Sequence, residues 1–375
     1  DIMPFLEGMR EAEEYQKQGR LLDASNVLRV LIEAQPNAAP LRRKMLEVLA
    51  TAGGLHQGKS HLVALLERDP LSREALRTYA AIILRDGQAA RAERLLLHAL
   101  KLPLGPEEVA APGVGSVTER DILRDIGVAR IAQKKLDQAI EPYAELLRRD
   151  PTDEEAHRQL VRIHFARGRH DQAIRHCQAL VAISPNSASA RSDLATALAA
   201  SGRLPDAVAQ HRQALALDPA HRYSIGQLGS IFLAHGHYAQ AAKVWAQGLQ
   251  NRPRDVQLAQ RLAWLLATCP EEDVADPDEA IHLGRQIVNL TGGENVGALD
   301  TLAVAQARAG RFEAAIENAR KALELADAAG QDEQAELLKK RIELYRQEKP
   351  YIQEPTAPPT TRPATAPATA PAGGW

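Results

Sequence analysis

The stretch SIGQLGSIFLAHGHYAQAAKVWAQGLQNRP, residues 224–253, decides the fold. Its apolar residues recur at intervals of three and four, which is the spacing of one face of an α-helix. Gly236 separates two such apolar runs, and Pro253 follows the second. Glycine tolerates the left-handed backbone that ends a helix, whereas proline cannot continue one. The stretch therefore predicts two helices joined by a tight turn and closed by a stop.

Proline repeats this unit along the chain at a fixed interval of 34 residues. Between two of these prolines the interval grows to two periods plus an excess of 13 residues, which predicts an insertion. A period of this length with proline closing each unit is typical of helix–turn–helix repeats that stack on one another. The prolines are Pro36, Pro70, Pro151, Pro185, Pro219 and Pro253.

Two further columns keep the same period. A small residue recurs inside the second helix of each unit, where it allows close packing, and a glycine precedes most of these by five residues. The small residues are Ala24, Gly58, Ala92, Ala139, Ala173, Ala207, Ala241, Ala280 and Ala315. The glycines are Gly19, Gly53, Gly87, Gly168, Gly202, Gly236 and Gly310.

These columns resemble the tetratricopeptide repeat family over about residues 5–347. The family's Leu-Gly pair, aromatic, turn glycine and bulky helix residue correspond here to Leu228-Gly229, Phe232, Gly236 and Trp245. The resemblance implies an all-α solenoid of about nine repeats, in which the first helix of each pair, helix A, lines a concave face. The sequence departs from the pattern at Gly58, at Lys134 in place of a turn glycine, and at Asp327 in place of a proline.

The period and its interruptions divide the chain into five parts. We expect the first repeat to form helices over 4–18 and 22–34, and a capping helix to cover 331–347. The five parts are three N-terminal repeats at 1–104, an exposed insert loop at 105–118, four regular repeats at 119–254, an irregular C-terminal module with its capping helix at 255–352, and a tail at 353–375 rich in proline, threonine and alanine.

The C-terminal module carries a narrower resemblance. Its segments LAWLLAT at 262–268, LDTLA at 299–303 and LYR at 344–346 look like a module common in bacterial tetratricopeptide proteins, often attached to membrane or envelope proteins. The resemblance covers about 260–352. It implies a bacterial source and favours the cell envelope or the extracellular space over the cytoplasm.

The tail has a composition that cannot build a core and that favours an extended, polyproline-like chain. Three interpretations stay open: a disordered linker, a stalk glycosylated on its threonines, or a docked tail with Trp375 as an aromatic anchor.

Several classes of function are disfavoured. A formal net charge of −2 does not indicate a nucleic-acid binder, and the longest apolar runs are too short to span a bilayer. No catalytic motif is present, so we expect no enzyme activity and no cofactor.

His235 and His237 are expected to be surface residues of a turn rather than metal ligands. Cys177 is expected in the core and Cys269 in a loop, without a disulfide between them.

The candidate site is a row of basic side chains on helix A. The fifth position of four consecutive units carries arginine, and neighbouring positions add three further cations. Such a row could bind the carboxylates of an extended acidic segment. Alternatively, the arginines pair within the solenoid, to Asp125 or to acids of the next repeat. The predicted groove residues are Arg43, Lys44, Arg77, Arg85, Arg124, Arg158 and Arg162.

Two function classes follow from this organisation. The first is a non-catalytic scaffold that binds a peptide or a partner protein in the concave groove. The alternative is a self-assembling structural subunit, a filament or an oligomer, which uses the solenoid ends and the tail of a neighbour.

Overall fold

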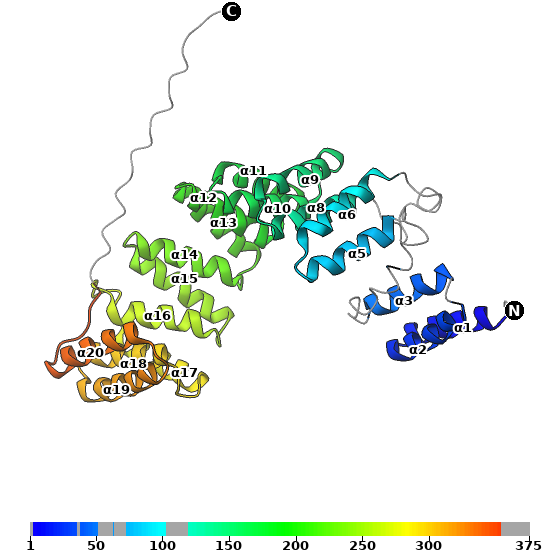
Figure 1. Ribbon diagram of the computed structural model, residues 1–375. Helices are drawn as coiled ribbons and strands as arrows, with labels where there is room; N and C mark the ends of the chain where they lie inside the picture. The colour runs from blue at the N-terminus through cyan, green and yellow to red at the C-terminus, as the bar shows by residue number, and fades with distance from the viewer. Residues whose placement is uncertain (1–2, 36–37, 52–62, 64–72, 103–118, 354–375) are drawn as a thin grey trace, which may run out of the picture. The chain divides into compact units, whose positions relative to one another are not determined.

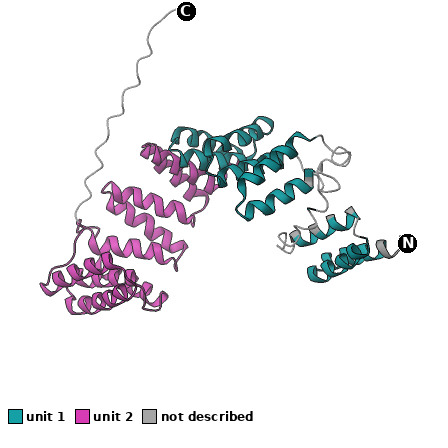
Figure 2. Cartoon of the chain, viewed as in Figure 1, with its two compact units in different colours: residues 1–183 teal, residues 184–375 magenta. Residues whose placement is uncertain are grey.

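A computed structural model describes residues 3–35, 38–51, 63, 73–102 and 119–353 of the chain (Figure 1). Over these residues the chain forms eighteen α-helices and no strand, which confirms the predicted all-α fold. The helices fall into two compact units, Asp1–Ile183 and Ser184–Trp375, which are coloured separately in Figure 2.

The first unit holds α1 (Met3–Lys17), α2 (Leu21–Ala34), α3 (Ala39–Thr51), α5 (Arg73–Arg85), α6 (Ala89–Lys101), α8 (Glu119–Ala132), α9 (Leu136–Arg149), α10 (Glu154–Ala166) and α11 (His170–Ile183). The second holds α12 (Ala188–Ala200), α13 (Leu204–Leu217), α14 (Arg222–Ala234), α15 (Tyr238–Asn251), α16 (Val256–Thr268), α17 (Pro277–Leu290), α18 (Val296–Arg308), α19 (Phe312–Ala328) and α20 (Asp332–Arg346).

The predicted helix pairs are confirmed where the structure describes them. Helices α1 and α2 match the expected 4–18 and 22–34 to within one residue, and α20 matches the expected capping helix. The number of repeats and the five-part division stay predictions. The insert loop at 105–118 and the tail beyond residue 353 lie outside the described residues.

The column of small residues is the tightest part of the core. Every alanine of the column has an exposed fraction of 0%, and Gly58 lies outside the described residues. Large side chains from the second helix fill the remaining space. A Cβ added at Gly229 on α14 would lie 2.1 Å from Nε1 of Trp245 on α15. Small residues thus set how closely the helices of a pair approach.

The turn glycines adopt the left-handed backbone that the sequence predicts. Gly168, Gly202 and Gly236 have φ of 67°, 82° and 74°, and Gly19, Gly87 and Gly310 behave alike, whereas Gly53 lies outside the described residues. Lys134, which replaces the turn glycine between α8 and α9, takes the same conformation with φ of 61°. A side chain with a Cβ is strained there.

Replacing Lys134 by glycine is expected to stabilise the first unit by about 1 kcal/mol, because relief of the left-handed strain exceeds the added entropy of the unfolded chain. Urea denaturation followed by circular dichroism measures the change. Lys135→Gly, one residue on at the N-cap of α9, serves as the control and should not stabilise. Equal or lower stability of Lys134→Gly would contradict the strain.

Buried aspartates join successive helix pairs. Asp153 caps α10 through the N–H of Ala156, and its other oxygen accepts hydrogen bonds from Arg120 and Arg124 of α8, each at 2.9 Å. Asp255 caps α16 and pairs with Arg222 of α14 at 2.9 Å. Burial alone would raise the pKa of both carboxyls, but the backbone and arginine hydrogen bonds hold it below the usual range.

Glu93 makes a similar junction between α6 and the α8–α9 pair. Its buried carboxylate accepts hydrogen bonds from Arg130 and Gln133, both at 2.8 Å, and from Lys135 at 3.2 Å. Burial opposes ionisation, yet these donors lower the pKa of Glu93 to about 2. Ionic contacts of this kind connect one helix pair to the next in the first unit.

Candidate interaction surfaces

Each helix A buries one stripe and leaves the opposite stripe outside the core. On α10 the buried stripe includes Leu160 and Ile163, and the opposite stripe carries Arg158, Arg162 and Ala166, all exposed. We call this opposite stripe the helix-A face of each unit; it is formed by the first helices α5, α8 and α10 in the first unit and by α12, α14, α16 and α18 in the second. The predicted groove residues that the structure describes in α5, α8 and α10 lie on it.

Two of the predicted arginines pair with carboxylates of the next repeat. Arg77 of α5 pairs with Asp125 of α8 at 2.5 Å and lies 3.6 Å from Asp121. Arg124 pairs with the buried Asp153 at 2.9 Å. The pairing that the alternative interpretation anticipates, to Asp125 and to an acid of the next repeat, is therefore present at both positions.

The remaining predicted cations differ in how far they are engaged. Arg158 pairs with Glu154 one turn away on α10, and Lys44 pairs with Glu47 at 3.1 Å. Arg85 and Arg162 are exposed and form no hydrogen bond or ion pair with any described residue. The side chain of Arg43 lies outside the described residues. Capture of an acidic ligand by the row stays a prediction, and Arg85 and Arg162 are its most available members.

The helix-A face of the last repeats is covered by residues 332–353 of the same chain. On α18 ten consecutive residues, 298–307, are buried, although an uncovered helix A buries only one stripe. The cover consists of α20 and of the strap, which we define as residues 347–353, the non-helical segment that follows α20. The last repeats therefore show this face occupied.

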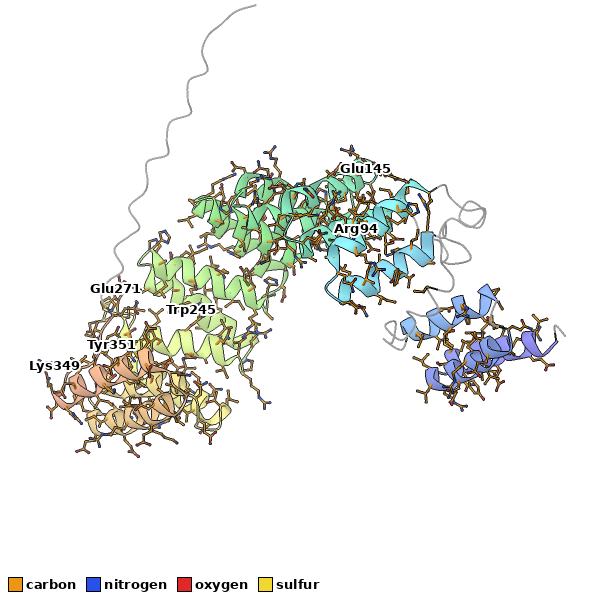
Figure 3. All side chains as sticks on the ribbon, viewed as in Figure 1. Arg94, Glu145, Trp245, Glu271, Lys349 and Tyr351 are labelled. Carbon is orange, nitrogen blue, oxygen red and sulfur yellow. The ribbon has the colours of Figure 1, made fainter. Side chains whose placement is uncertain are left out.

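An ion pair and two rings fix this cover. Arg341 of α20 donates to Asp300 of α18, and its guanidinium lies 5.1 Å from the ring centres of both Trp264 and Tyr351. Tyr351, labelled in Figure 3, lies 6.1 Å from the Trp264 ring. The strap ends with the N–H of Gln353 donating to the carbonyl of Thr268 at 3.0 Å.

The sequence did not reveal this arrangement. Asp300 stands at the fifth position of helix A, where four other repeats carry arginine, and an acid there was a signal that a cation would approach. The aromatic Tyr351, after the last helix and before the tail, was the second signal. Neither signal identifies Arg341 as the partner, because the contact depends on how α20 packs.

Three histidines inside one helix pair were also missed as a group. Nδ1 of His157 lies 3.0 Å from Nδ1 of His176, and the ring of His164 stacks on His176 with centres 5.5 Å apart. Burial lowers the pKa of His176 to about 4, and the neighbouring His157 lowers it further in the same direction. Burial also lowers the pKa of His164. His164 and His176 are therefore neutral at pH 7.

The structure also describes the two histidines and two cysteines for which the sequence predicts no functional role. Nδ1 of His235 donates one hydrogen bond to the carbonyl of Ile231 at 2.8 Å, and His237 is exposed. Cys177 and Cys269 are both buried and neither forms a disulfide, and Cys269 lies directly after α16. Among the described residues, no three or more His, Cys, Asp or Glu side chains are placed so that they could hold a metal ion, and no helix is long and apolar enough to cross a membrane.

Comparison with known proteins supplies the family. The model of the tetratricopeptide repeat family matches residues 130–191 and 165–224, which cover α9–α13. Residues 130–224 are therefore built of tetratricopeptide repeats. No protein with curated information matches its sequence.

Several solved structures share the tetratricopeptide fold. Pseudomonas aeruginosa pilF is 15% identical, with a TM-score of 0.45, covering 61% of this chain and 98% of its own. YrrB, described as a protein with an unusual peptide-binding site, is 16% identical, with a TM-score of 0.42, covering 53% of this chain and 96% of its own. MamA from Desulfovibrio magneticus RS-1 is 20% identical, with a TM-score of 0.39, covering 47% of this chain and 96% of its own. Likeness at this level carries no argument about function.

Proposed function

We propose that this tetratricopeptide repeat protein is a non-catalytic scaffold that binds an extended segment of a partner protein on its helix-A face. Proteins of this family are generally interaction scaffolds without catalysis of their own.

The strap is the observation that carries the proposal. It crosses the helix-A face from α20 to α16 as a non-helical segment, with one aromatic ring against Trp264 and one backbone hydrogen bond to Thr268. This face therefore accommodates a non-helical chain through aromatic contacts and main-chain hydrogen bonds. A partner segment would use the same two kinds of contact in the preceding repeats.

The equivalent positions upstream leave room for such a segment. Ala166, Ala200 and Ala234 stand at the position of Thr268 in their own helices and are exposed, whereas Thr268 is buried. Their short side chains permit a peptide backbone to approach the helix closely. Arg85 and Arg162, which have no acidic partner among the described residues, would bind carboxylates of the segment.

Selection of binding peptides from a random phage-displayed library tests this function. We expect acidic peptides to be enriched, to protect amides of α5, α8 and α10 from hydrogen exchange, and to bind at least about tenfold more weakly to the variant Arg85→Glu/Arg162→Glu. The reversal avoids Arg77 and Arg124, whose ion pairs support the fold.

The matched control is Arg94→Glu/Arg175→Glu, which makes the same change of charge on the exposed sides of the second helices α6 and α11 (Figure 3 labels Arg94). It should bind the selected peptides like the unmodified protein. Equal binding by the Arg85/Arg162 variant, or amide protection confined to second helices, would refute the proposal. Self-assembly of the chain stays a prediction that no observation here favours.

A further inference from the structure

In the second unit, a groove lies between α13 and α15, each of which is the second helix of its helix pair. Its volume is about 660 Å³, its walls are α13 and α15, and its floor is α14. Ile225, Leu228 and Phe232 form the apolar floor, and half-buried Leu215 and Val244 line the lower walls. The groove opens on the side formed by second helices, so it is separate from the helix-A face.

The packing of the floor keeps this groove open. Gly248 of α15 faces Ile225 of α14, and a Cβ at position 248 would lie 2.5 Å from a methyl group of Ile225. The glycine allows α15 to rest low on the floor helix, while α13 and α15 remain apart. The space between them is consequently a feature of the backbone and not of one side-chain rotamer.

The rim of the groove is basic and rich in amides. Arg212 rises from the α13 wall, with its guanidinium 5.8 Å from the centre of the Phe232 ring, and Lys243 rises from the α15 wall. Both are exposed, and neither forms an ion pair with a described residue. Gln240, Gln247 and Asn251 complete the α15 wall, and no acid lines the groove.

This charge pattern is local to the second unit. Between residues 207 and 270 the sequence has six lysines and arginines but only two acids, Asp218 and Asp255, although the whole chain has a net charge of −2. Asp218 caps the N–H of Ala220, and Asp255 is held by Arg222 and Arg252. Neither acid is available to neutralise Arg212 or Lys243.

We propose that the α13–α15 groove is a second binding site, which takes an acidic segment of a partner protein that alternates carboxylates with apolar side chains. The apolar side chains would contact the floor above Leu228 and Phe232. The carboxylates would pair with Arg212 and Lys243 on opposite walls. The glutamine amides both donate and accept hydrogen bonds, which suits the peptide groups of the segment.

A nucleic acid fits these observations less well. Nucleic-acid sites combine many phosphate-binding cations with exposed aromatic rings that stack on bases. Here two cations flank an apolar floor, and Phe232 is buried beneath Arg212. The polarity of the groove suits a polypeptide segment better.

Fluorescence anisotropy with the full chain tests the proposal. The probe is a fluorescein-labelled synthetic peptide in which glutamate and leucine alternate, and the matched probe carries glutamine in place of every glutamate. We expect the glutamate peptide to bind, the glutamine peptide to bind at least about tenfold more weakly, and the variant Arg212→Glu/Lys243→Glu to lose binding by a similar factor. Arg320→Glu/Lys321→Glu, with the same change of charge on exposed positions of α19, should bind like the unmodified protein.

The milder variant Arg212→Gln/Lys243→Gln guards against misfolding of the reversed one, and it should also weaken binding. Absence of binding to the glutamate peptide, equal binding of both peptides, or equal binding by both Arg212/Lys243 variants would overturn the proposal. It would also be overturned if a single-stranded DNA oligonucleotide bound in place of the peptide. Self-association of the chain that is lost in the reversed variant would assign the groove to a second copy instead. If the variant Arg85→Glu/Arg162→Glu bound its selected peptides normally, the anisotropy test of the groove would still stand, because the groove and the helix-A face share no residue.

Discussion

Between pH 7 and pH 5 the second unit is expected to lose about 2 kcal/mol of its free energy of unfolding through His211 alone. His211 of α13 has an exposed fraction of 1%, and its Nδ1 lies 3.3 Å from the hydroxyl of Ser224. Burial lowers its pKa from 6.5 to about 4, and the neighbouring His221 contributes in the same direction. The first unit should lose somewhat less through His176, which is only half-buried.

The sign follows from proton uptake. Above pH 6.5 both the folded and the unfolded histidine are neutral, so the low pKa has no effect on stability. As the pH falls from 6.5 to about 4, the unfolded chain binds a proton that the folded chain excludes, and the folded state becomes less stable. Below about pH 4 the folded histidine is also protonated and the loss stops growing.

Urea denaturation at pH 7, 6 and 5 measures this slope. His211→Gln and His176→Gln should each flatten it, whatever they do to stability at pH 7. The controls His98→Gln and His282→Gln alter exposed histidines, one in each unit, and should keep the full slope. Retention of the full slope in both buried variants would show that these imidazoles are not the source of the acid sensitivity.

The repeat register could have predicted where these histidines lie. His157 and His164 stand two periods before Ile225 and Phe232, and His211 stands one period before Trp245. Each therefore occupies a core position of the repeat. Period alone reveals burial in this way because every repeat uses the same backbone. The period predicted the left-handed turn glycines and the close packing of the alanines for the same reason.

Side-chain pairing was harder to predict. Arg77 and Arg158 occupy the same repeat position, yet one pairs with the next repeat and the other with its own helix. The difference depends on which acid stands within reach after the helices have packed, and several acids qualify in sequence. The position of the strap could not be predicted for a further reason. The strap lies outside the repeats, so the repeat period does not indicate that it packs against Trp264.

The largest mutational effect in the second unit is expected at Arg341. Its guanidinium lies between the buried Asp300 carboxylate and the Trp264 and Tyr351 rings. Burial raises the pKa of Asp300, and the charge of Arg341 opposes that rise. Replacing Arg341 by methionine preserves most of the apolar contact but leaves a buried, unpaired carboxyl group. Such a loss costs about 3–5 kcal/mol.

Urea denaturation of the full chain at pH 7 measures this cost. The control Arg346→Met removes a surface pair with Glu343 on the same helix and should change stability by less than about 1 kcal/mol. The double variant Asp300→Leu/Arg341→Met removes both buried charges and should recover at least about 2 kcal/mol relative to Arg341→Met, since a buried pair can be exchanged for apolar side chains at little cost. Equal stability of the single and double variants would mean that Arg341 acts through its stacking on the two rings. The strap would then be held on the helix-A face by aromatic contact and not by charge, and an incoming peptide would need a ring in place of a carboxylate to take its position.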